Sequence, residues 1–242
     1  MRKSWIAIVA LAALAAGCSG SKQTEQAAAA EARKTEWSWL EDAKKNLDAK
    51  RQELAGLEAQ AAAGAIDQAK VDQFHQEVDK AEDIFGGKLA TYINGDPPVL
   101  GEPMNPSQLA AMRMKSDEDI LIAKDFITLG GDYRKAIDIL NSSLQADPDN
   151  PALKAALAAA EANRFMSAER FAKVKKGMSE AEIKAALGVP LARNVKHYPE
   201  KKIVAWFYPK TESGDAAGIW FNEKGVAYQV NFEAVKAGGE GK

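Results

Sequence analysis

The stretch 203-IVAWFYPKTESGDAAGIWFNEKGVAYQVNF-232 decides the fold of the C-terminal part of the chain. It holds short runs rich in apolar, β-branched and aromatic residues, which predict strands over 203–208, 217–221 and 226–232, and apolar residues alternate in the last of them. The last two strands are separated by Asn-Glu-Lys-Gly at 222–225, a sequence typical of a hairpin turn. Alternation in the last strand gives the sheet one apolar face, and that face must pack on a helix.

The helix for that face is predicted just before the strands. Ser179 and Glu182 have the spacing of a capping box, and Gly188 followed by Pro190 ends the helix after Leu187. A helix on an antiparallel sheet, preceded by a long region with helical periodicity, predicts an α+β fold class for the chain.

These residues resemble the SmpA/OmlA (BamE-like) domain over 169–236. The likeness rests on Gly-Met-Ser at 177–179, Leu-Gly-Val-Pro at 187–190, Trp-Phe-Tyr at 206–208 and Phe-Asn-Glu-Lys-Gly-Val at 221–226. The resemblance implies two helices packed on a three-stranded antiparallel sheet. It also implies a lipoprotein subunit of the outer-membrane β-barrel assembly machinery, although the same fold recurs in other envelope proteins and resembles a protein inhibitor of β-lactamases. Fold therefore transfers better than function.

The region 116–168 resembles one tetratricopeptide unit. Ser116 or Asp117 is expected to cap a first helix, which runs to about 129, and a third helix is expected from 151 to about 170. One such unit predicts a packing scaffold, because a peptide-binding groove needs several stacked repeats. The residues at the repeat's small, aromatic and proline positions are Gly131, Tyr133, Ala136, Ser143 and Pro148.

An antiparallel helical hairpin is predicted over 31–93. Two apolar stripes with coiled-coil spacing meet at a turn in which Gly64 takes the left-handed conformation and Asp67 caps the second helix. Trp37 and Trp39 are expected to pack within the hairpin or between domains, with a partner contact as the alternative. The proline- and glycine-rich stretch 94–115 is predicted to be a linker.

The N-terminus has the pattern of an export signal. Arg2 and Lys3 precede an uncharged apolar run over 5–16, which is too short to span a bilayer, and the run ends in Leu-Ala-Ala-Gly-Cys at 14–18. This sequence resembles the lipobox of bacterial lipoproteins, which implies that 1–17 is a signal peptide and that Cys18 carries the acyl groups. Because Ser19 is not an aspartate, the resemblance favours the outer membrane, facing the periplasm. Residues 18–30 are small and polar and are expected to form a flexible tether, and 237–242 a disordered tail.

Composition narrows the class of function. Removal of 1–17 leaves 30 basic and 34 acidic residues, so no basic surface for nucleic acid is expected. A single cysteine excludes an intramolecular disulfide. His75 and His197 each stand alone, and no catalytic, phosphate-binding or metal-binding motif is present, so no enzyme activity, cofactor or metal is predicted.

The leading hypothesis is a non-enzymatic protein-interaction module, bound to the membrane through Cys18 and contacting envelope proteins, including the barrel assembly machinery. Its candidate contact residues are Trp206, Tyr208 and Trp220, with a place in the core of the sheet domain as the alternative. The other hypotheses are a structural or peptidoglycan-binding lipoprotein and, third, an inhibitor of a periplasmic enzyme.

Overall fold

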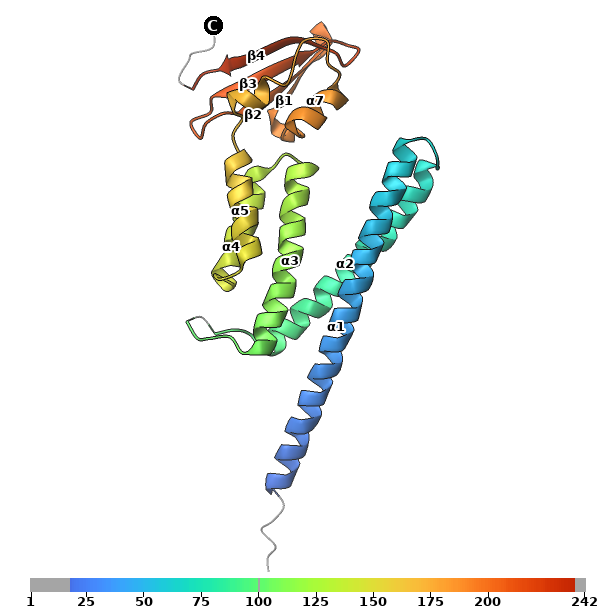
Figure 1. Cartoon of the computed structure of the whole chain (residues 1–242), viewed down its shortest axis with the longest axis vertical. Coiled ribbons are helices and arrows are strands. Elements are labelled where there is room, and N and C mark those ends of the chain that lie inside the picture. Colours follow the sequence, from blue (N-terminus) through green and yellow to red (C-terminus); the bar gives the residue numbers. More distant parts are fainter. Residues whose placement is uncertain (1–17, 100, 238–242) are drawn as a thin grey trace, which may run out of the picture. The chain divides into compact units, whose positions relative to one another are not determined.

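A computed structural model describes residues 18–99 and 101–237 (Figure 1). The predicted signal peptide over 1–17 and nearly all of the predicted tail over 237–242 lie outside the described residues. The chain divides after Gly101 into two compact units, a helical hairpin and a mixed unit. The predicted α+β class is confirmed, since helices fill the first unit and a C-terminal antiparallel sheet completes the second.

The first unit is the predicted antiparallel hairpin of α1 (Cys18–Ala62) and α2 (Gln68–Gly95). Gly64 has the left-handed conformation (φ +72°), and the Asp67 carboxylate accepts from the Ala69 N–H to cap α2. Apart from Leu89, the buried residues of the described seam recur every seven positions, which is the coiled-coil repeat. They are Leu40, Leu47 and Leu54 on α1 and Val71, Val78, Phe85 and Tyr92 on α2.

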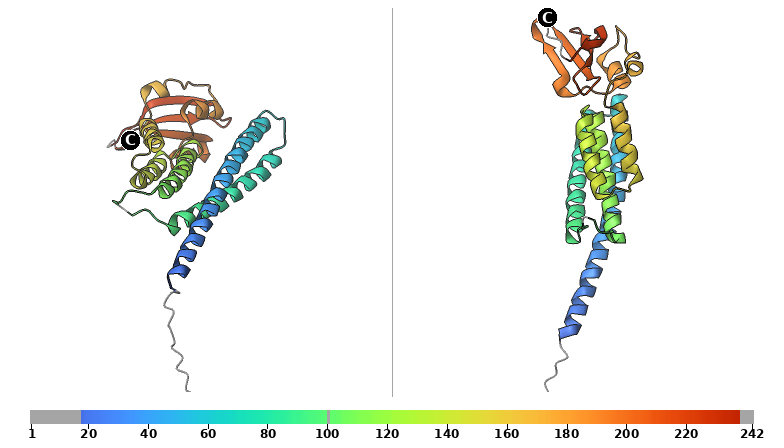
Figure 2. Two further views of the ribbon diagram at one scale, coloured as in Figure 1. Left: turned by 60° about the horizontal axis from the view of Figure 1, so that its bottom comes forward. Right: turned by 90° about the vertical axis from the view of Figure 1, so that its left-hand side faces the viewer.

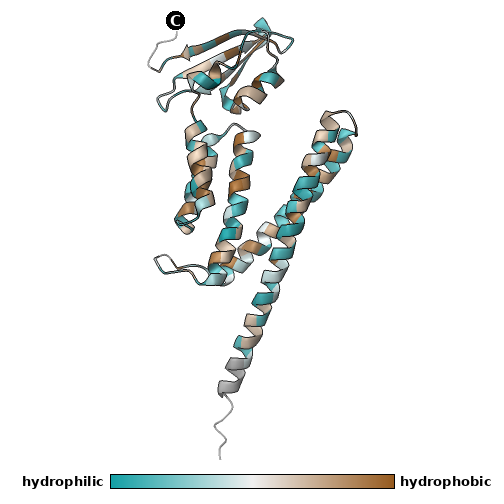
Figure 3. Ribbon diagram, viewed as in Figure 1, coloured by the Kyte–Doolittle hydropathy of each residue, from teal (hydrophilic) through white to brown (hydrophobic). Residues whose placement is uncertain are grey.

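The flexible tether expected over 18–30 is helical instead. Residues 24–32 of α1 are all exposed, so no packing holds this part in shape. Two causes explain the helix: four consecutive alanines with Glu, Gln and Lys are strong helix formers, and the packed part of α1 supplies the nucleus from which the helix extends. Much of this helix is hydrophilic in Figure 3.

The two tryptophans of α1 differ in their surroundings. Trp37 packs on Tyr92 of α2 with ring centroids 5.4 Å apart, and the Arg33 guanidinium lies 3.9 Å from the centre of the same Tyr92 ring. Trp39 is 42% exposed. Trp37 therefore packs within the hairpin, as expected, whereas Trp39 lies at the surface of the first unit.

The helices of the second unit are α3 (Pro106–Thr128), α4 (Tyr133–Ala146) and α5 (Pro151–Asn163). The predicted start of the first of them at Ser116 or Asp117 is wrong. Asn105 caps α3 in a capping box with Gln108, and Pro106 occupies the first helical position, where its missing N–H costs nothing. The expected linker therefore ends about ten residues earlier, and Ser116 is buried inside α3 with its hydroxyl bonded to the Met112 carbonyl.

The tetratricopeptide-like packing positions are buried where α3, α4 and α5 meet. Ala136 and Ser143 lie in this core, and Asp147 ends α4. Asp147 is 1% exposed and is held by Arg113 and by the Asn150 amide, while Asn150 caps α5. The third helix ends at Asn163 rather than near 170, and a separate short helix α6 (Ala168–Phe171) comes after it.

The sheet domain contains α7 (Glu180–Leu187) and the strands β1 (Val195–Tyr198), β2 (Ile203–Pro209), β3 (Ala216–Phe221) and β4 (Ala227–Val235). They form an antiparallel sheet in the order β1-β2-β3-β4. The strand β1 was not predicted, and it corrects the three-stranded sheet to a four-stranded one. His197 lies on this strand opposite Val204.

The capping box at the start of α7 is confirmed: the Ser179 hydroxyl and the Glu182 carboxylate each bond the other residue's N–H. Backbone bonds also join this turn to β4, since Gly177 N donates to Ala227 O at 2.7 Å and Ala227 N donates to Met178 O at 2.9 Å. The helix thus lies with one face on the sheet (Figure 2).

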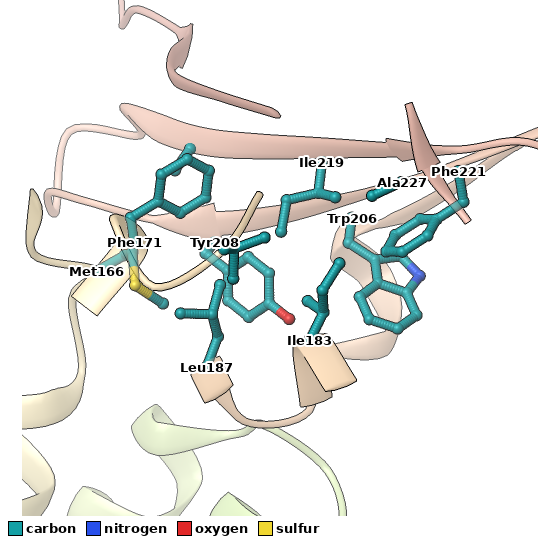
Figure 4. Close-up of a cluster of buried hydrophobic side chains, with 11 residues drawn as sticks. Met166, Phe171, Ile183, Leu187, Trp206, Tyr208, Ile219, Phe221 and Ala227 are labelled. Atoms are coloured by element: carbon teal, nitrogen blue, oxygen red, sulfur yellow. The ribbon is translucent and has the colours of Figure 1, made fainter. Parts of the chain in front are cut away.

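One layer of side chains fills the space between α6, α7 and the sheet (Figure 4). Ile183 and Leu187 project from α7 toward the strands, and Trp206, Tyr208, Ile219 and Phe221 project toward the helix.

Candidate functional site

Two of the three predicted contact residues belong to the core. Trp206 is 4% exposed, with its ring 4.4 Å from that of Phe221, and Tyr208 is 6% exposed. The prediction that these side chains contact a partner is therefore wrong, and the alternative, core packing, describes them. They face α7 because residues at 206 and 208 share one face of β2.

Trp220 points to the opposite face of the sheet. It is half-buried, and its ring lies across Gly218, whose position leaves no room for a Cβ beneath the indole. The Phe207 ring meets it edge-on, with centroids 5.7 Å apart. The two rings are half-buried and in contact with each other, and Trp220 remains a candidate contact residue.

Phe207 also lines a pocket of about 210 Å³ where the helices of the second unit meet the sheet domain. Four segments distant in sequence form its walls: the turn between α3 and α4, the segment after α5, the segment after α7, and the loop between β2 and β3. We call this space the junction pocket. The sequence did not predict the junction pocket, because its lining residues come from separate segments and form no motif within any one of them.

One wall of the junction pocket depends on close backbone packing at Gly131. The φ of Gly131 is +64°, and a Cβ built on it would lie 2.2 Å from the carbonyl oxygen of Val189 and 2.8 Å from the Leu191 nitrogen. The helical turn thus rests directly on the backbone after α7. A second connection comes from Met166 N, which donates to Pro209 O at 2.7 Å, so the helical layer is joined to the sheet domain at two places.

Arginines dominate the charge of the junction pocket. Arg134 and Arg164 both bind the carboxylate of Glu212, at 3.3 Å and 2.5 Å. Arg193 lies on the exposed turn after α7 and has no ion-pair partner among the residues that the structure describes. Four arginines and two carboxylates, Asp132 and Glu212, are among the lining residues, so this site is positive in a chain whose net charge is −2.

Arg170, the fourth arginine, has a structural role. Its guanidinium donates to the backbone carbonyls of Asn163 and Leu187, at 2.9 Å and 3.1 Å, and so ties the end of α5 to the end of α7. Beside it, the Tyr208 hydroxyl donates to Gly188 O at 3.0 Å. Burial raises the pKa of the Tyr208 phenol, and the charge of Arg170 opposes that rise only in part, so the phenol acts as a hydrogen-bond donor and not as a base.

The junction pocket offers binding groups but few reactive ones. No histidine, cysteine or serine occurs among its described lining residues. The apolar walls include Phe165, which lies under the Arg164 guanidinium at 4.8 Å, together with Val189 and Pro190. Such a mixture of arginine and aromatic side chains is typical of surfaces that bind proteins.

The remaining candidates for chemistry are scattered. His75 on α2 lies 3.2 Å from Asp79, four residues along the same helix, and His197 is exposed on β1. Within residues 18–99 and 101–237 no cluster of His, Cys, Asp or Glu side chains could hold a metal ion. In the same ranges, none of the helices has the length and the apolar character needed to cross a membrane. Cys18 is the first residue of α1.

No protein-family model matches this sequence, and none of the curated proteins or solved structures compared with it is similar enough to count as a relative.

Proposed function

We propose that the chain is an outer-membrane-anchored periplasmic lipoprotein that acts as a non-enzymatic protein-interaction module through its second unit. The observation that carries the proposal is the pair of half-buried aromatic rings of Phe207 and Trp220, of which Phe207 also lines the arginine-rich junction pocket. Buried aromatic and arginine side chains supply most of the binding energy in protein interfaces.

The anchor in this proposal is the lipidated Cys18. Its support is the sequence at 14–18. About fifteen residues of α1 precede the first contact with α2, and at 1.5 Å per residue they span about 22 Å. A helix of this length would hold the packed hairpin away from the lipid surface.

The anchor is tested by growing cells with labelled palmitate. The wild-type protein is expected to take up the label, and a Cys18→Ser variant is expected to take up none. An unlabelled wild-type protein would remove the membrane part of the proposal.

The interaction role is tested by replacing Trp220 with a photo-crosslinking residue in intact cells. A matched control carries the same residue in place of Ile84, which is 59% exposed on α2 in the first unit. Adducts with an envelope protein are expected from position 220 and not from position 84. Identical adducts from both positions, or none from position 220, would contradict the role.

The crosslinking experiment also separates the versions of the hypothesis. Membership in the β-barrel assembly machinery predicts that its components are among the adducts at position 220, and their absence would remove that particular role. A structural lipoprotein that binds peptidoglycan would instead sediment with purified cell wall whether or not Trp220 is present.

A further inference from the structure

The junction pocket is occupied in part by a carboxylate of the chain itself. Glu212, on the loop between β2 and β3, places its two oxygens on two different arginines of the helical layer, Arg134 and Arg164. A site that holds a carboxylate from within the chain has the geometry to hold one from another chain, because guanidinium groups recognise the planar carboxylate with paired hydrogen bonds.

Glu212 is also easy to displace. Its side chain is 62% exposed, and ion pairs at the surface contribute little to stability. The loop has its own backbone bond, from Lys210 N to Asp215 O at 2.7 Å, and the Thr211 hydroxyl accepts from Asp215 N at 3.2 Å. Removal of the carboxylate therefore requires only a rotation of the Glu212 side chain, with the loop left in place.

The size and the walls of the junction pocket indicate which kind of group accompanies the carboxylate. The volume of about 210 Å³ is below that of pockets that enclose a whole small molecule or cofactor, which starts at about 300 Å³. It suits one large side chain of a peptide, and Phe165, Phe207 and Val189 supply apolar contacts for it. Arg193, without an ion-pair partner in the described part of the chain, lies on the lining for a second acidic group.

We propose that the junction pocket binds an acidic peptide segment of a partner protein, whose carboxylate replaces Glu212 on Arg134 and Arg164 while an adjacent apolar side chain enters between Phe165 and Phe207. Glu212 is then an internal competitor that keeps the arginines neutralised until the partner arrives. This inference rests on the proposed function, since it names the chemistry of the partner.

The test uses the full chain in detergent and labelled peptides in which aspartate or glutamate alternates with phenylalanine or leucine. Binding is measured by fluorescence anisotropy at low and at high salt. The peptides are expected to bind, and two controls are expected to fail: the same peptides with lysine in place of the acidic residues, and with alanine in place of the apolar ones. Equal binding of the lysine peptides, or no binding by any acidic peptide, would overturn the proposal.

The variant Glu212→Gln distinguishes competition from simple attraction. Removal of a surface ion pair is expected to tighten peptide binding about 1.5- to 5-fold. Arg164→Gln is expected to weaken it at least about tenfold, because a charged hydrogen bond is lost. Lys224→Gln, on the turn between β3 and β4, removes a positive charge outside the pocket lining and is expected to change little. Unchanged or weaker binding by Glu212→Gln would show that Glu212 does not compete.

Two further measurements keep the conclusions apart. Circular dichroism of Arg164→Gln, melted beside the wild type, shows whether the variant is folded, and Arg193→Gln gives a second, exposed arginine change if it is not. Binding is also measured with vesicles of anionic lipid. If the vesicles bind through the same arginines and no peptide binds, the proposal is wrong and the arginines contact a membrane instead. If acidic peptides bind while position 220 yields no adduct in cells, the pocket stands and the proposed function falls. If adducts form and Glu212→Gln leaves them unchanged, the function stands and this site falls.

Discussion

Replacing Gly131 with alanine is the sharpest perturbation of the second unit. A left-handed conformation costs an alanine about 1–2 kcal/mol relative to glycine. The new Cβ would also lie 2.2 Å from Val189 O and within 3 Å of two further backbone atoms, so the backbone on one side must move. Overpacking of this kind costs a further 1–3 kcal/mol or so, and the variant is expected to lose about 3 kcal/mol of unfolding free energy.

Gly225 provides the matched control. Its φ of +69° is close to that of Gly131, but its nearest neighbour for a Cβ is the Glu180 side chain at 3.7 Å, an ordinary contact. Gly225→Ala therefore carries the cost of the conformation, about 1–2 kcal/mol, without the clash. The difference between the two variants isolates the contact of the helical turn with the segment after α7.

Urea unfolding followed by tryptophan fluorescence measures both variants, with Trp206 and Trp220 reporting on the sheet domain. With a slope of about 2 kcal/mol per molar urea, Gly131→Ala should lower the midpoint of the second unit by about 1.5 M and Gly225→Ala by roughly half of that. The transition of the first unit should not move. If the two glycine variants were equally stable, the reasoning that Gly131 joins the helices to the sheet domain would be refuted.

Three other predictions concern stability. Asp147→Ala removes the partner of Arg113 and of the Asn150 amide and should lower the free energy of unfolding in urea by about 2 kcal/mol. A loss below about 0.5 kcal/mol would contradict a stabilising role for the buried carboxylate. Ser179→Ala should cost about 1 kcal/mol. In the folded protein, hydrogen bonds from the Ser179 N–H and hydroxyl lower the pKa of Glu182. The ionised Glu182 carboxylate therefore stabilises the fold above its ordinary pKa of about 4.5, and this stabilisation is lost as the pH falls below that value. In thermal melts at acid pH, Ser179→Ala should accordingly lose less stability than the wild type. Burial raises the pKa of Tyr208, so its contribution is complete below about pH 10 and is lost as the pH rises above it; Tyr208→Phe should flatten this alkaline loss in melts between about pH 9 and 11, and an unchanged slope would contradict the burial argument.

The sequence predicted those parts of the fold in which one segment carries its own pattern. The strand predicted over 226–232 and the helix after Ser179 were found because alternation and the capping box are local signals. The edge strand β1 was missed because three of its four residues are exposed and it has no alternation to detect. The start of α3 was missed because Pro106 is part of a loop-like composition, although proline is also favoured at the first position of a helix.

The candidate site was predicted less well, for a different physical reason. Trp206 and Trp220 are both aromatic residues on strands. Trp206 belongs to the core because it lies on the face of the sheet that α7 covers, whereas Trp220 lies on the other face. Arg134, Arg164 and Glu212 come from three segments, and the ion pairs among them arise only when the helical layer packs on the sheet domain. The spacing of these residues in the sequence therefore could not predict the ion pairs.

The seven-residue repeat in the seam of the hairpin makes the length of the hairpin adjustable. Adding seven residues to each helix beside the turn would extend the seam by about 10 Å and leave every leucine, valine and phenylalanine facing the partner helix as before. Adding two or five would rotate the stripe away from its partner. The reach of this hairpin can thus be changed in whole heptads with its seam preserved.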